Sequence, residues 1–368
     1  MTYRVLHIVP NTCYVSGITK VIMNYYKLID KTKYQFDFLY MDEYEESVNN
    51  DISLMGGRYF CIGNIIHYSS FKRNLDQFCK EHVNEYSVVH LHMPFLAIFF
   101  YKLKKKLNAK AFVLHAHSTR FGNNFLSNTR NWLFYKLFHN KADSYFACSE
   151  KAGIALFKND YKNNGFFMLD VCSPHDTESI AKNDSKKELG LDNNIVIGHV
   201  GVFCPPKNHL FIVDVFNEYL KIQPNAKLLL VGDGPLRKKV QDYVSMKNLN
   251  NYVIFTGAQY DVDKFYPAMD AFLFPSIFEG FAMALVEAQS FGIPCLTSDI
   301  IVKEVNFNTK VNKMLSLNLG PKEWANNLNE IVNKPTIDEQ YSSIFMIENE
   351  QRARLLEEKY FSLINENK

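Results

Sequence analysis

The sequence lacks any long hydrophobic run. Across its 368 residues, no stretch approaches the roughly 18–20 consecutive apolar residues that a membrane-spanning helix needs. The N-terminal segment Met1–Pro10 contains a short apolar run but not the pattern of a cleavable secretion signal. We therefore expect a cytoplasmic protein that meets a membrane only peripherally, at the inner face of the plasma membrane.

Cysteines are few, and none belongs to a Cys-x-x-Cys pair. The seven are scattered along the chain: Cys13, Cys61, Cys79, Cys148, Cys172, Cys204 and Cys295. An odd number at irregular spacing argues against a disulfide framework and against a zinc knuckle, and it favours a reducing compartment.

The chain also lacks a strong excess of charge of either sign, since its formal net charge is +2 at pH 7. This small total argues against a nucleic-acid binder. The charge is unevenly distributed, because residues 72–162 hold 15 Lys or Arg against 6 Asp or Glu, with aromatic residues interleaved. Such a segment suits an anionic membrane surface or a lipid-diphosphate acceptor, and a merely solvated helix face is the alternative.

Short β-rich runs alternate with longer amphipathic runs in both halves of the chain. This alternation is typical of parallel α/β sheets, and the length suits two domains of roughly 170 residues each. In the first half we expect strands at Arg4–Val9, Phe36–Met41, Val88–His92, Ala111–His115 and Ser144–Cys148, and helices at Ile18–Ile29, Phe71–Val83, Phe95–Leu107 and Thr129–Asn140. In the second half we expect strands at Ile195–Val200, Lys227–Val231, Val253–Thr256, Ala271–Phe274 and Pro294–Thr297.

The alternation is interrupted around Phe167–Asp192, where a domain boundary is expected. We predict an N-terminal domain over residues 1–175 and a C-terminal domain over residues 176–343. A last charged, amphipathic helix is expected within residues 344–368.

Glycine follows four strands of the second half: Gly201, Gly232, Gly257 and Gly280. Ligands of open parallel sheets bind beyond the carboxyl ends of the strands, and glycine there lets a ligand approach the backbone closely. Tight turns alone also need glycine. Together, the four predict a binding crevice at one edge of the second sheet.

The segment Phe274–Pro294 is the most informative part of the chain. Residues 281–290 predict an almost wholly apolar, buried helix that nevertheless carries the carboxylate of Glu287. A second carboxylate, Glu279, lies at the expected helix start, about 12 Å along the axis from Glu287. Free amides at that helix start favour an anion, so we expect a diphosphate there and carboxylates that bind sugar hydroxyls. The alternative is a capping Glu279 and a structural Glu287 paired with a lysine.

Two further patterns raise the question of a metal. The pairs His90-x-His92 and His115-x-His117 each place two imidazoles on one strand face. A four-histidine metal site is one interpretation, and structural or substrate-binding histidines are the other. Asp261-Val-Asp263 looks like a metal-binding Asp-x-Asp but opens the expected helical stretch Val262–Met269, where aspartate is a good cap. We therefore expect no obligatory metal.

Glu279-x7-Glu287, with Gly-Phe after the first glutamate and Ala-Gln after the second, resembles the Glu-x7-Glu motif of glycosyltransferase family 4. Similar blocks extend over nearly the whole chain, in particular those of the branch that builds bacterial capsular polysaccharides and exopolysaccharides. They are Ala142-Asp143, Ala147-Cys-Ser-Glu150, Lys207-Asn208-His209, Gly232-Asp-Gly-Pro235, Phe255-Thr-Gly257 and Ser316–Trp324. The resemblance implies the GT-B fold, in which two Rossmann-like, doubly wound parallel-sheet domains face a central cleft. It also implies that the C-terminal helix of residues 344–368 crosses back to the N-terminal domain.

By this resemblance, Glu287 would hold the ribose of the donor nucleotide. Glu279 would contact the transferred sugar and stabilise charge in the transition state. Lys207 would bind the diphosphate together with the amides near Phe281 and Ala282.

Further donor contacts are implied elsewhere. Gly17 would mark a first-domain loop that approaches the phosphates, and His117 would hydrogen-bond the donor sugar, with His115 as the second choice. The donor site would be completed by Gly201, Gly232, Gly257, Gly280 and Met283.

The sequence departs from the family at Val202, where an arginine that binds the diphosphate usually follows the glycine. Ser16 replaces the first glycine of the usual pair, and Ser173 stands near an expected asparagine. A bidentate cation is not replaced by valine, so Val202 bears directly on donor binding.

The resemblance implies a retaining, metal-independent glycosyltransferase of the hexosyltransferase class. It would move a sugar from a nucleotide-diphosphate sugar, with UDP as the expected carrier, to a glycan or lipid-diphosphate-linked acceptor in surface polysaccharide synthesis. No cofactor beyond the donor substrate is expected. Val202 keeps open a second hypothesis, an inactive homologue that serves as partner or scaffold of an active transferase. A third, such as a nucleotide-sugar epimerase, is disfavoured because no epimerase-like arrangement is found.

Overall fold

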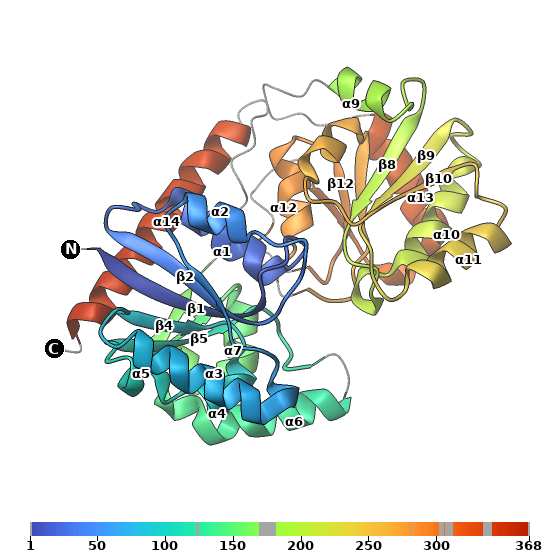
Figure 1. Ribbon diagram of the computed structural model, residues 1–368. Coiled ribbons are helices and arrows are strands. Elements are labelled where there is room, and N and C mark those ends of the chain that lie inside the picture. Colours follow the sequence, from blue (N-terminus) through green and yellow to red (C-terminus); the bar gives the residue numbers. More distant parts are fainter. Residues whose placement is uncertain are drawn as a thin grey trace. The chain divides into compact units, whose positions relative to one another are not determined.

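The computed structural model describes residues 2–122, 125–168, 182–279, 281–301, 305, 312–333 and 341–366 (Figure 1). The chain divides into two compact units. Unit 1 consists of Met1–Ser173 and Glu348–Lys368, and unit 2 of Pro174–Ile347. The expected boundaries were 175/176 and 343/344. No helix in the described part of the chain combines the length and apolar character that a membrane crossing requires.

Unit 1 is built on a seven-stranded parallel sheet of order β3-β2-β1-β4-β5-β6-β7. Its strands are β1 (Tyr3–Asn11), β2 (Tyr34–Asp42), β3 (Tyr59–Cys61), β4 (Val88–Leu91), β5 (Ala111–Ala116), β6 (Ser144–Ala147) and β7 (Gly165–Phe167). The middle strands β4, β5 and β6 are wholly buried and mostly apolar, as expected for strands covered on both faces. The order of the strands reverses between β1 and β4, which makes this pair the switch point of unit 1.

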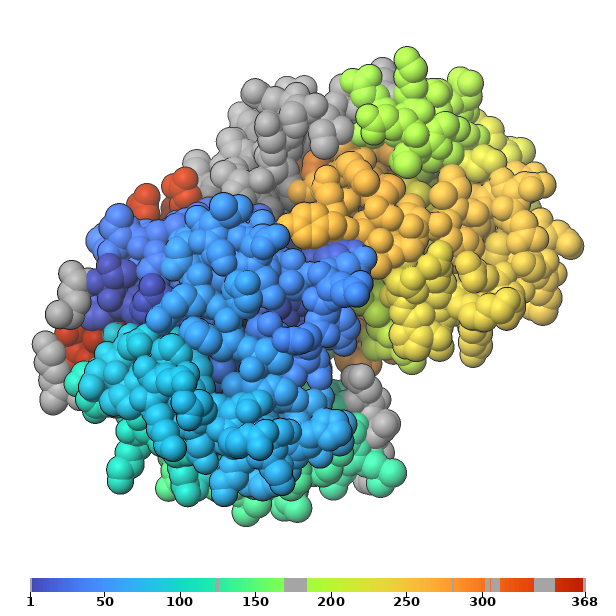
Figure 2. All heavy atoms as spheres, in the orientation of Figure 1, coloured from blue at the N-terminus to red at the C-terminus, as the bar shows by residue number. Residues whose placement is uncertain are grey.

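Helices connect these strands. They are α1 (Gly17–Leu28), α2 (Asn49–Leu54), α3 (Tyr68–Glu81), α4 (Ala97–Phe100), α5 (Leu103–Lys106), α6 (Phe125–Phe138), α7 (Glu150–Phe157) and α8 (Asn159–Asn164), with 3-10 turns η1 (Ile65–His67), η2 (Pro94–Leu96) and η3 (His139–Lys141). Helix α6 packs against η2 and α4. Its atoms lie at the surface along the lower edge of unit 1 in Figure 2.

The single helix predicted over Phe95–Leu107 is wrong. The segment forms η2, α4 and α5. Between the two α-helices, Tyr101 and Lys102 have ψ angles of −27° and −10°, which are less negative than those of a regular α-helix. Residues 98–101 are β-branched or aromatic, and such residues are weaker helix formers than straight-chain ones. Phe100, Leu103 and Leu107 are all buried, at a spacing that would also share one face of an unbroken helix.

Helix α14 (Tyr341–Glu366) ends the described chain, and its unit 1 part lies along the first sheet (Figure 1). The hydroxyl of Tyr360 lies 2.7 Å from Nδ1 of His90 on β4. The hydroxyl of Tyr34 donates to the carbonyl of Glu357 at 2.9 Å, and the Glu357 carboxylate accepts from the amide of Asp30 at 2.8 Å. These contacts attach the C-terminal residues to β2 and β4, far away in sequence.

Unit 2 contains a six-stranded parallel sheet of order β10-β9-β8-β11-β12-β13. Its strands are β8 (Ile195–Val200), β9 (Ala226–Val231), β10 (Val253–Gly257), β11 (Ala271–Phe274), β12 (Cys295–Ser298) and β13 (Asn312–Leu315). Its helices are α9 (Lys182–Glu188), α10 (His209–Leu220), α11 (Arg237–Met246), α12 (Met283–Ser290) and α13 (Gly320–Asn333), with 3-10 turns η4 (Pro205–Lys207), η5 (Asp263–Ala268) and η7 (Leu317–Leu319). The strand order reverses between β8 and β11, the switch point of unit 2.

Candidate active site

Two loops meet at the carboxyl edge of the unit 2 sheet, beside its switch point. The loop after β8 contains η4, and the loop after β11 begins at Pro275. The side-chain amide of Asn208 donates to the carbonyl of Pro275 at 3.2 Å, and the amide of Ile277 donates to the carbonyl of Pro206 at 2.8 Å. Asn208 adopts a left-handed conformation with φ of 59°, which asparagine tolerates better than most residues. The two loops are therefore joined by one side-chain and one backbone hydrogen bond.

This contact brings Lys207 and Glu279 into an ion pair. The Lys207 ammonium lies 2.8 Å from Oε1 of Glu279, and both side chains are largely buried, at 17% and 11% exposed. The same ammonium lies 4.7 Å from the centroid of the Phe274 ring. A lysine in this position can bind a phosphate. If the ion pair separates, the Lys207 ammonium and the Glu279 carboxylate can each contact a ligand.

The helix after these loops begins later than predicted. Helix α12 begins at Met283, so Phe281 and Ala282 precede it, and Ala282 is its N-cap. The amide of Met283 donates to the carbonyl of Phe281 at 3.2 Å, and the amide of Leu285 donates to that of Ala282 at 3.0 Å. The prediction of a helix over residues 281–290 with Glu279 at its start is therefore wrong by two residues. The helical separation predicted for the two glutamates does not apply, because Phe281 and Ala282 lie outside the helix.

Glu287 is the buried member of the motif, at 2% exposure. Its Oε2 accepts a hydrogen bond from the hydroxyl of Tyr266 at 2.6 Å. Tyr266 lies in η5 and is fully buried. Lys207, the lysine beside this site, pairs with Glu279. Tyr266 was missed, because nothing in a lone tyrosine of a short turn signals such a partner.

The strand-end glycines lie side by side on neighbouring strands. The amide of Gly232 donates to the carbonyl of Gly257 at 3.0 Å, and that of Gly201 to the carbonyl of Val231 at 3.0 Å. Gly232 has φ of 134°, and a Cβ there would stand 2.2 Å from the carbonyl oxygen of Gly201. Close backbone packing thus requires glycine at this position, whatever ligand binds. Gly280 lies outside the described residues.

Val202 and Arg237 lie near the same edge. The Val202 side chain is 46% exposed. On α11, Nη1 of Arg237 pairs with Oδ2 of Asp233 at 2.6 Å. A Cβ built on Gly257 would lie 3.5 Å from the same Nη1, so the Arg237 guanidinium stands over the end of β10. Sequence reasoning missed this cation.

Asp261 acts locally. Its Oδ1 accepts from the amide of Asp263 at 3.1 Å, at the start of η5. This is a local turn one residue before the N-cap, which is Val262, so the capping role predicted for Asp261 in a helical stretch from Val262 is not the one observed.

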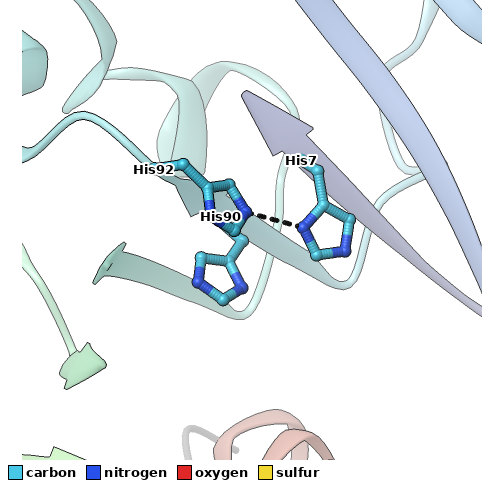
Figure 3. Close-up of side chains that lie close together, drawn as sticks. All are labelled: His7, His90 and His92. Carbon is cyan, nitrogen blue, oxygen red and sulfur yellow. Dashed lines mark hydrogen bonds between the residues drawn. The ribbon is translucent and has the colours of Figure 1, made fainter. Parts of the chain in front are cut away.

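In unit 1, Gly17 begins α1, and Ser16 before it accepts from the amide of Thr19 at 3.4 Å. The two histidine pairs do come together, and His7 of β1 joins them. Figure 3 shows His7 beside His90 and His92. One ring nitrogen from each of His7, His90 and His92 lies within 4.8 Å of the other two, and the same holds for His92, His115 and His117. His7 was missed because it is a single histidine in an apolar strand.

Burial is the main cause of the low basicity of this cluster. It lowers the pKa of His7 and of His117 to about 3, with the charge on His117 adding to the effect on His7. It holds the pKa of His90, His92 and His115 well below the ordinary value. Neither group contains a carboxylate or thiolate among the described residues. The ligands that these two groups offer a metal are therefore neutral imidazoles alone.

Models of two families match the chain. Glycosyltransferase Family 4 matches residues 15–161, and Glycosyl transferases group 1 matches residues 181–344. EpsF of Bacillus subtilis (strain 168), a protein named as a glycosyltransferase, is 30% identical over 333 residues, which are 88% of this chain and 86% of EpsF. The capsular polysaccharide biosynthesis glycosyltransferase CapH of Staphylococcus aureus is 26% identical over 67% of this chain and 69% of CapH.

Two further comparisons extend this result. An Escherichia coli UDP-Gal:alpha-D-GlcNAc-diphosphoundecaprenol alpha-1,3-galactosyltransferase is 34% identical over 127 residues, which are 33% of each chain. The structure of HepE from Anabaena, in complex with UDP and glucose, superposes with a TM-score of 0.78 at 16% identity, over 97% of this chain and 99% of HepE. The chain therefore belongs to glycosyltransferase family 4 and has the GT-B fold of two parallel-sheet α/β domains.

Proposed function

We propose that this protein is a retaining glycosyltransferase that moves a sugar from a UDP-sugar to a glycan or lipid-diphosphate-linked acceptor in surface polysaccharide synthesis. The observation that carries the proposal is the pair of Lys207 and Glu279 beside the unit 2 switch point, where open α/β sheets bind ligands. HepE with UDP and the Escherichia coli galactosyltransferase support UDP as the carrier. The latter also supports a lipid-diphosphate acceptor.

In this proposal Lys207 leaves Glu279 when the donor binds, and its ammonium contacts the diphosphate. The amides of Phe281 and Ala282, which precede α12, complete the anion site. Phosphate is a suitable occupant because it can take fixed N–H donors and the positive end of the helix dipole together. Glu287, oriented by Tyr266, then binds the ribose hydroxyls.

The released Glu279 contacts the transferred sugar and stabilises the positive charge that develops at its anomeric carbon. His117 hydrogen-bonds a hydroxyl of the same sugar, and Gly17 permits backbone approach to the phosphates. The acceptor hydroxyl attacks on the face from which the diphosphate departs, and the departing oxygen takes the acceptor proton. Negative charge grows on the diphosphate, so a fixed cation stabilises the transition state more than the ground state. Because Lys207 supplies that charge, we propose that no metal is required.

We further propose that α6 contacts an anionic membrane. Leu126, Leu133 and Leu137 are 80%, 52% and 59% exposed, and their spacing places them on one face of the helix. Arg130 lies on the same face, and the Lys136 ammonium stands 4.7 Å from the ring centroid of Trp132. The helix contains no Asp or Glu. Exposed leucines flanked by cations suit the interface of an anionic bilayer.

The membrane proposal is tested by sedimentation with vesicles of phosphatidylglycerol and phosphatidylcholine. We expect binding to the anionic vesicles only, reversed by salt, and lost in the double variant Leu133→Glu, Leu137→Glu. Leu54→Glu, which changes an 86% exposed leucine of α2, is the matched control and should bind like the parent. Equal binding of the double variant would show that another surface is responsible.

The transferase proposal is tested first by thermal shift with a panel of nucleotide sugars and free nucleotides, each with and without a chelator. A ligand at 100 times its Kd adds about 2.7 kcal/mol of stability, which is readily detected. We expect one UDP-sugar to stabilise the protein equally with and without chelator, and product analysis to show retention at the anomeric carbon. If no donor binds, the inactive-partner hypothesis replaces the transferase; if the chelator abolishes the shift, the metal-free mechanism is wrong.

A further inference from the structure

Five histidines gather on three neighbouring strands of unit 1. His7 lies on β1, His90 on β4 and His115 on β5, while His92 and His117 lie just beyond the ends of β4 and β5. All but His117 are buried. Figure 3 shows that the ring of His92 points toward His7, and that His90 lies alongside without joining that bond.

Three of these rings are linked in a chain. Nδ1 of His7 lies 2.9 Å from Nε2 of His92, and Nδ1 of His92 lies 2.8 Å from Nε2 of His117. His115 is just as close, since its ring centroid is 3.9 Å from that of His117. Yet neither nitrogen of His115 has a hydrogen-bond partner in the described structure. A histidine of this cluster can therefore lie close to His117 without being hydrogen-bonded to it.

The linkage couples the tautomers of the three rings. Burial keeps them neutral, and a neutral imidazole has one N–H and one lone pair. If Nε2–H of His92 donates to His7, then Nδ1 of His92 can only accept, and Nε2 of His117 must carry its proton. If Nδ1–H of His7 donates to His92 instead, each of the three rings carries its proton on Nδ1. In either case Nε2 of His117 is committed to His92, which leaves Nδ1 as the nitrogen that can meet a ligand.

The buried end of the chain favours one direction. Nε2 of His7 has no hydrogen-bond partner among the described residues, and its ring lies 4.3 Å from Phe36 and 5.9 Å from Phe38, measured between centroids. An N–H can be directed at an aromatic face, whereas a lone pair gains nothing there. With the proton on Nε2 of His7, all three rings are Nε2–H tautomers. Nδ1 of His117 is then a hydrogen-bond acceptor.

We infer that His92 is a positioning residue that fixes His117 as the Nε2–H tautomer, so that Nδ1 of His117 accepts a hydrogen bond from a hydroxyl of the transferred sugar. This inference rests on the proposed function, under which His117 contacts the donor. The fixed tautomer of His117 would also determine which donor sugars the site accepts. A site built to accept from a hydroxyl rejects an analogue that lacks it, because the fixed acceptor is left unpaired.

Two substitutions of His92 separate its two bonds. The amide of asparagine lies near the place of Nδ1, so His92→Asn keeps an acceptor toward His117 and loses the link to His7. The longer glutamine places its amide near Nε2, so His92→Gln keeps the link to His7 and loses His117. His115→Leu is the matched control, because His115 is equally buried and adjacent but unlinked.

The first readout is the tautomer of His117 in ¹⁵N-histidine-labelled protein without substrate, observed through the two-bond couplings of the ring nitrogens. The resonance is assigned by its absence in His117→Gln. We expect Nε2–H in the parent, in His92→Asn and in His115→Leu, and a mixture in His92→Gln. A mixture or an Nδ1–H ring in the parent overturns the inference without any variant, and so does an unchanged His117 in a folded His92→Gln.

The second readout is transfer. Loss of one hydrogen bond to the sugar should lower kcat/KM of His92→Gln about tenfold, while His92→Asn and His115→Leu stay within about threefold of the parent. His92→Gln should lower kcat/KM less for a donor whose sugar lacks the hydroxyl that binds His117, because that donor does not form this hydrogen bond. If the tautomers behave as expected but His117→Gln transfers normally, the chain of imidazoles stands and the sugar-binding role within the proposed function fails. A change of tautomer without any change in transfer overturns the positioning role itself.

Discussion

The two units place different chemistry at the same topological position. At the switch point of unit 1, between β1 and β4, the meeting side chains are His7 and His92, which are neutral and hydrogen-bonded. At that of unit 2, between β8 and β11, they are Lys207 and Glu279, which form an ion pair. Both sheets bring together residues distant in sequence. The fold therefore supplies the meeting place, and the residue types decide whether it forms a neutral buried cluster or a charged site that a ligand can open.

The largest expected effect is a difference in acid stability between the units. Burial depresses the pKa of five histidines in unit 1, to about 3 for His7 and His117, and of two in unit 2, His199 and His209. Above pH 6.5 neither the folded nor the unfolded chain protonates them. As pH falls from 6.5 toward 3, only the unfolded chain takes up protons. Each such histidine then lowers the free energy of unfolding by about 1.4 kcal/mol per pH unit.

We therefore expect unit 1 to unfold at a higher pH than unit 2. Trp324 is fully buried in unit 2, so its fluorescence in the Trp132→Phe protein reports that unit alone. Far-UV circular dichroism reports both units. On acidification, circular dichroism should change in two steps, and the fluorescence should follow only the step at lower pH. Coincident transitions by both probes would mean that the histidine cluster does not set the acid stability of unit 1.

A smaller effect is expected when the charged switch point is altered. Lys207→Ala should reduce transfer about 10²–10³-fold, the usual cost of losing one preorganised group at developing charge, and should weaken donor binding. Glu279→Gln should also abolish most transfer but leave donor binding intact or stronger, because Lys207 is released. Steady-state kinetics and calorimetric Kd values distinguish the two. Lys221→Ala, at a 64% exposed lysine paired with Glu218, is the control and should be silent.

The contact between Tyr266 and Glu287 tests the buried part of the site. Tyr266→Phe removes the hydroxyl that donates to Oε2 of Glu287 at 2.6 Å. The loss of a donor to a buried carboxylate should cost about 1–3 kcal/mol of stability, and the affinity for UDP should fall about tenfold as the carboxylate loses its orientation. Denaturant unfolding and nucleotide titration measure the two effects. Tyr243→Phe removes a similar hydroxyl, bonded to the partly exposed carboxylate of Asp214, and should leave the affinity for UDP unchanged.

Much of the architecture could be predicted because it depends on local patterns. The periodic apolar runs located the middle strands of both sheets within one or two residues, since a strand buried on both faces has little freedom of composition. The segment Phe95–Leu107 shows where such patterns stop. Its buried positions Phe100, Leu103 and Leu107 fit one face of a single helix, so the pattern gives no sign of the break at Tyr101 and Lys102.

The site was predictable where a spaced motif marked it, as for Glu279 and Glu287. Partners contributed by other strands had no such signal. Tyr266 and His7 are single residues whose importance arises from three-dimensional contacts, with Glu287 and with His92. The start of α12 was misplaced because composition alone does not distinguish an apolar helix from the apolar turn that leads into it.

The smallest expected effect concerns Arg237, whose guanidinium stands over Gly257. The position where the family usually has a diphosphate-binding arginine holds Val202 in this chain. If Arg237 replaces the missing charge, Arg237→Ala should weaken UDP-sugar binding up to about tenfold, with a reduced dependence on salt. Lys238→Ala is the control, since Lys238 is 82% exposed and pairs with Asp242 on the same helix. Binding that is equal in the two variants would exclude Arg237 from the donor site.

A second substitution that restores UDP binding to Arg237→Ala would test the role of positive charge at this edge of the unit 2 sheet more directly. Val202 is 46% exposed, so an arginine side chain fits there without burial. In the Arg237→Ala background, Val202→Arg should restore affinity, because a diphosphate needs positive charge near this edge more than it needs one particular residue to supply it. Titration of UDP into the single and double variants measures the restoration. If Val202→Arg adds the same affinity with and without Arg237, the two positions act independently and Arg237 does not compensate for the valine.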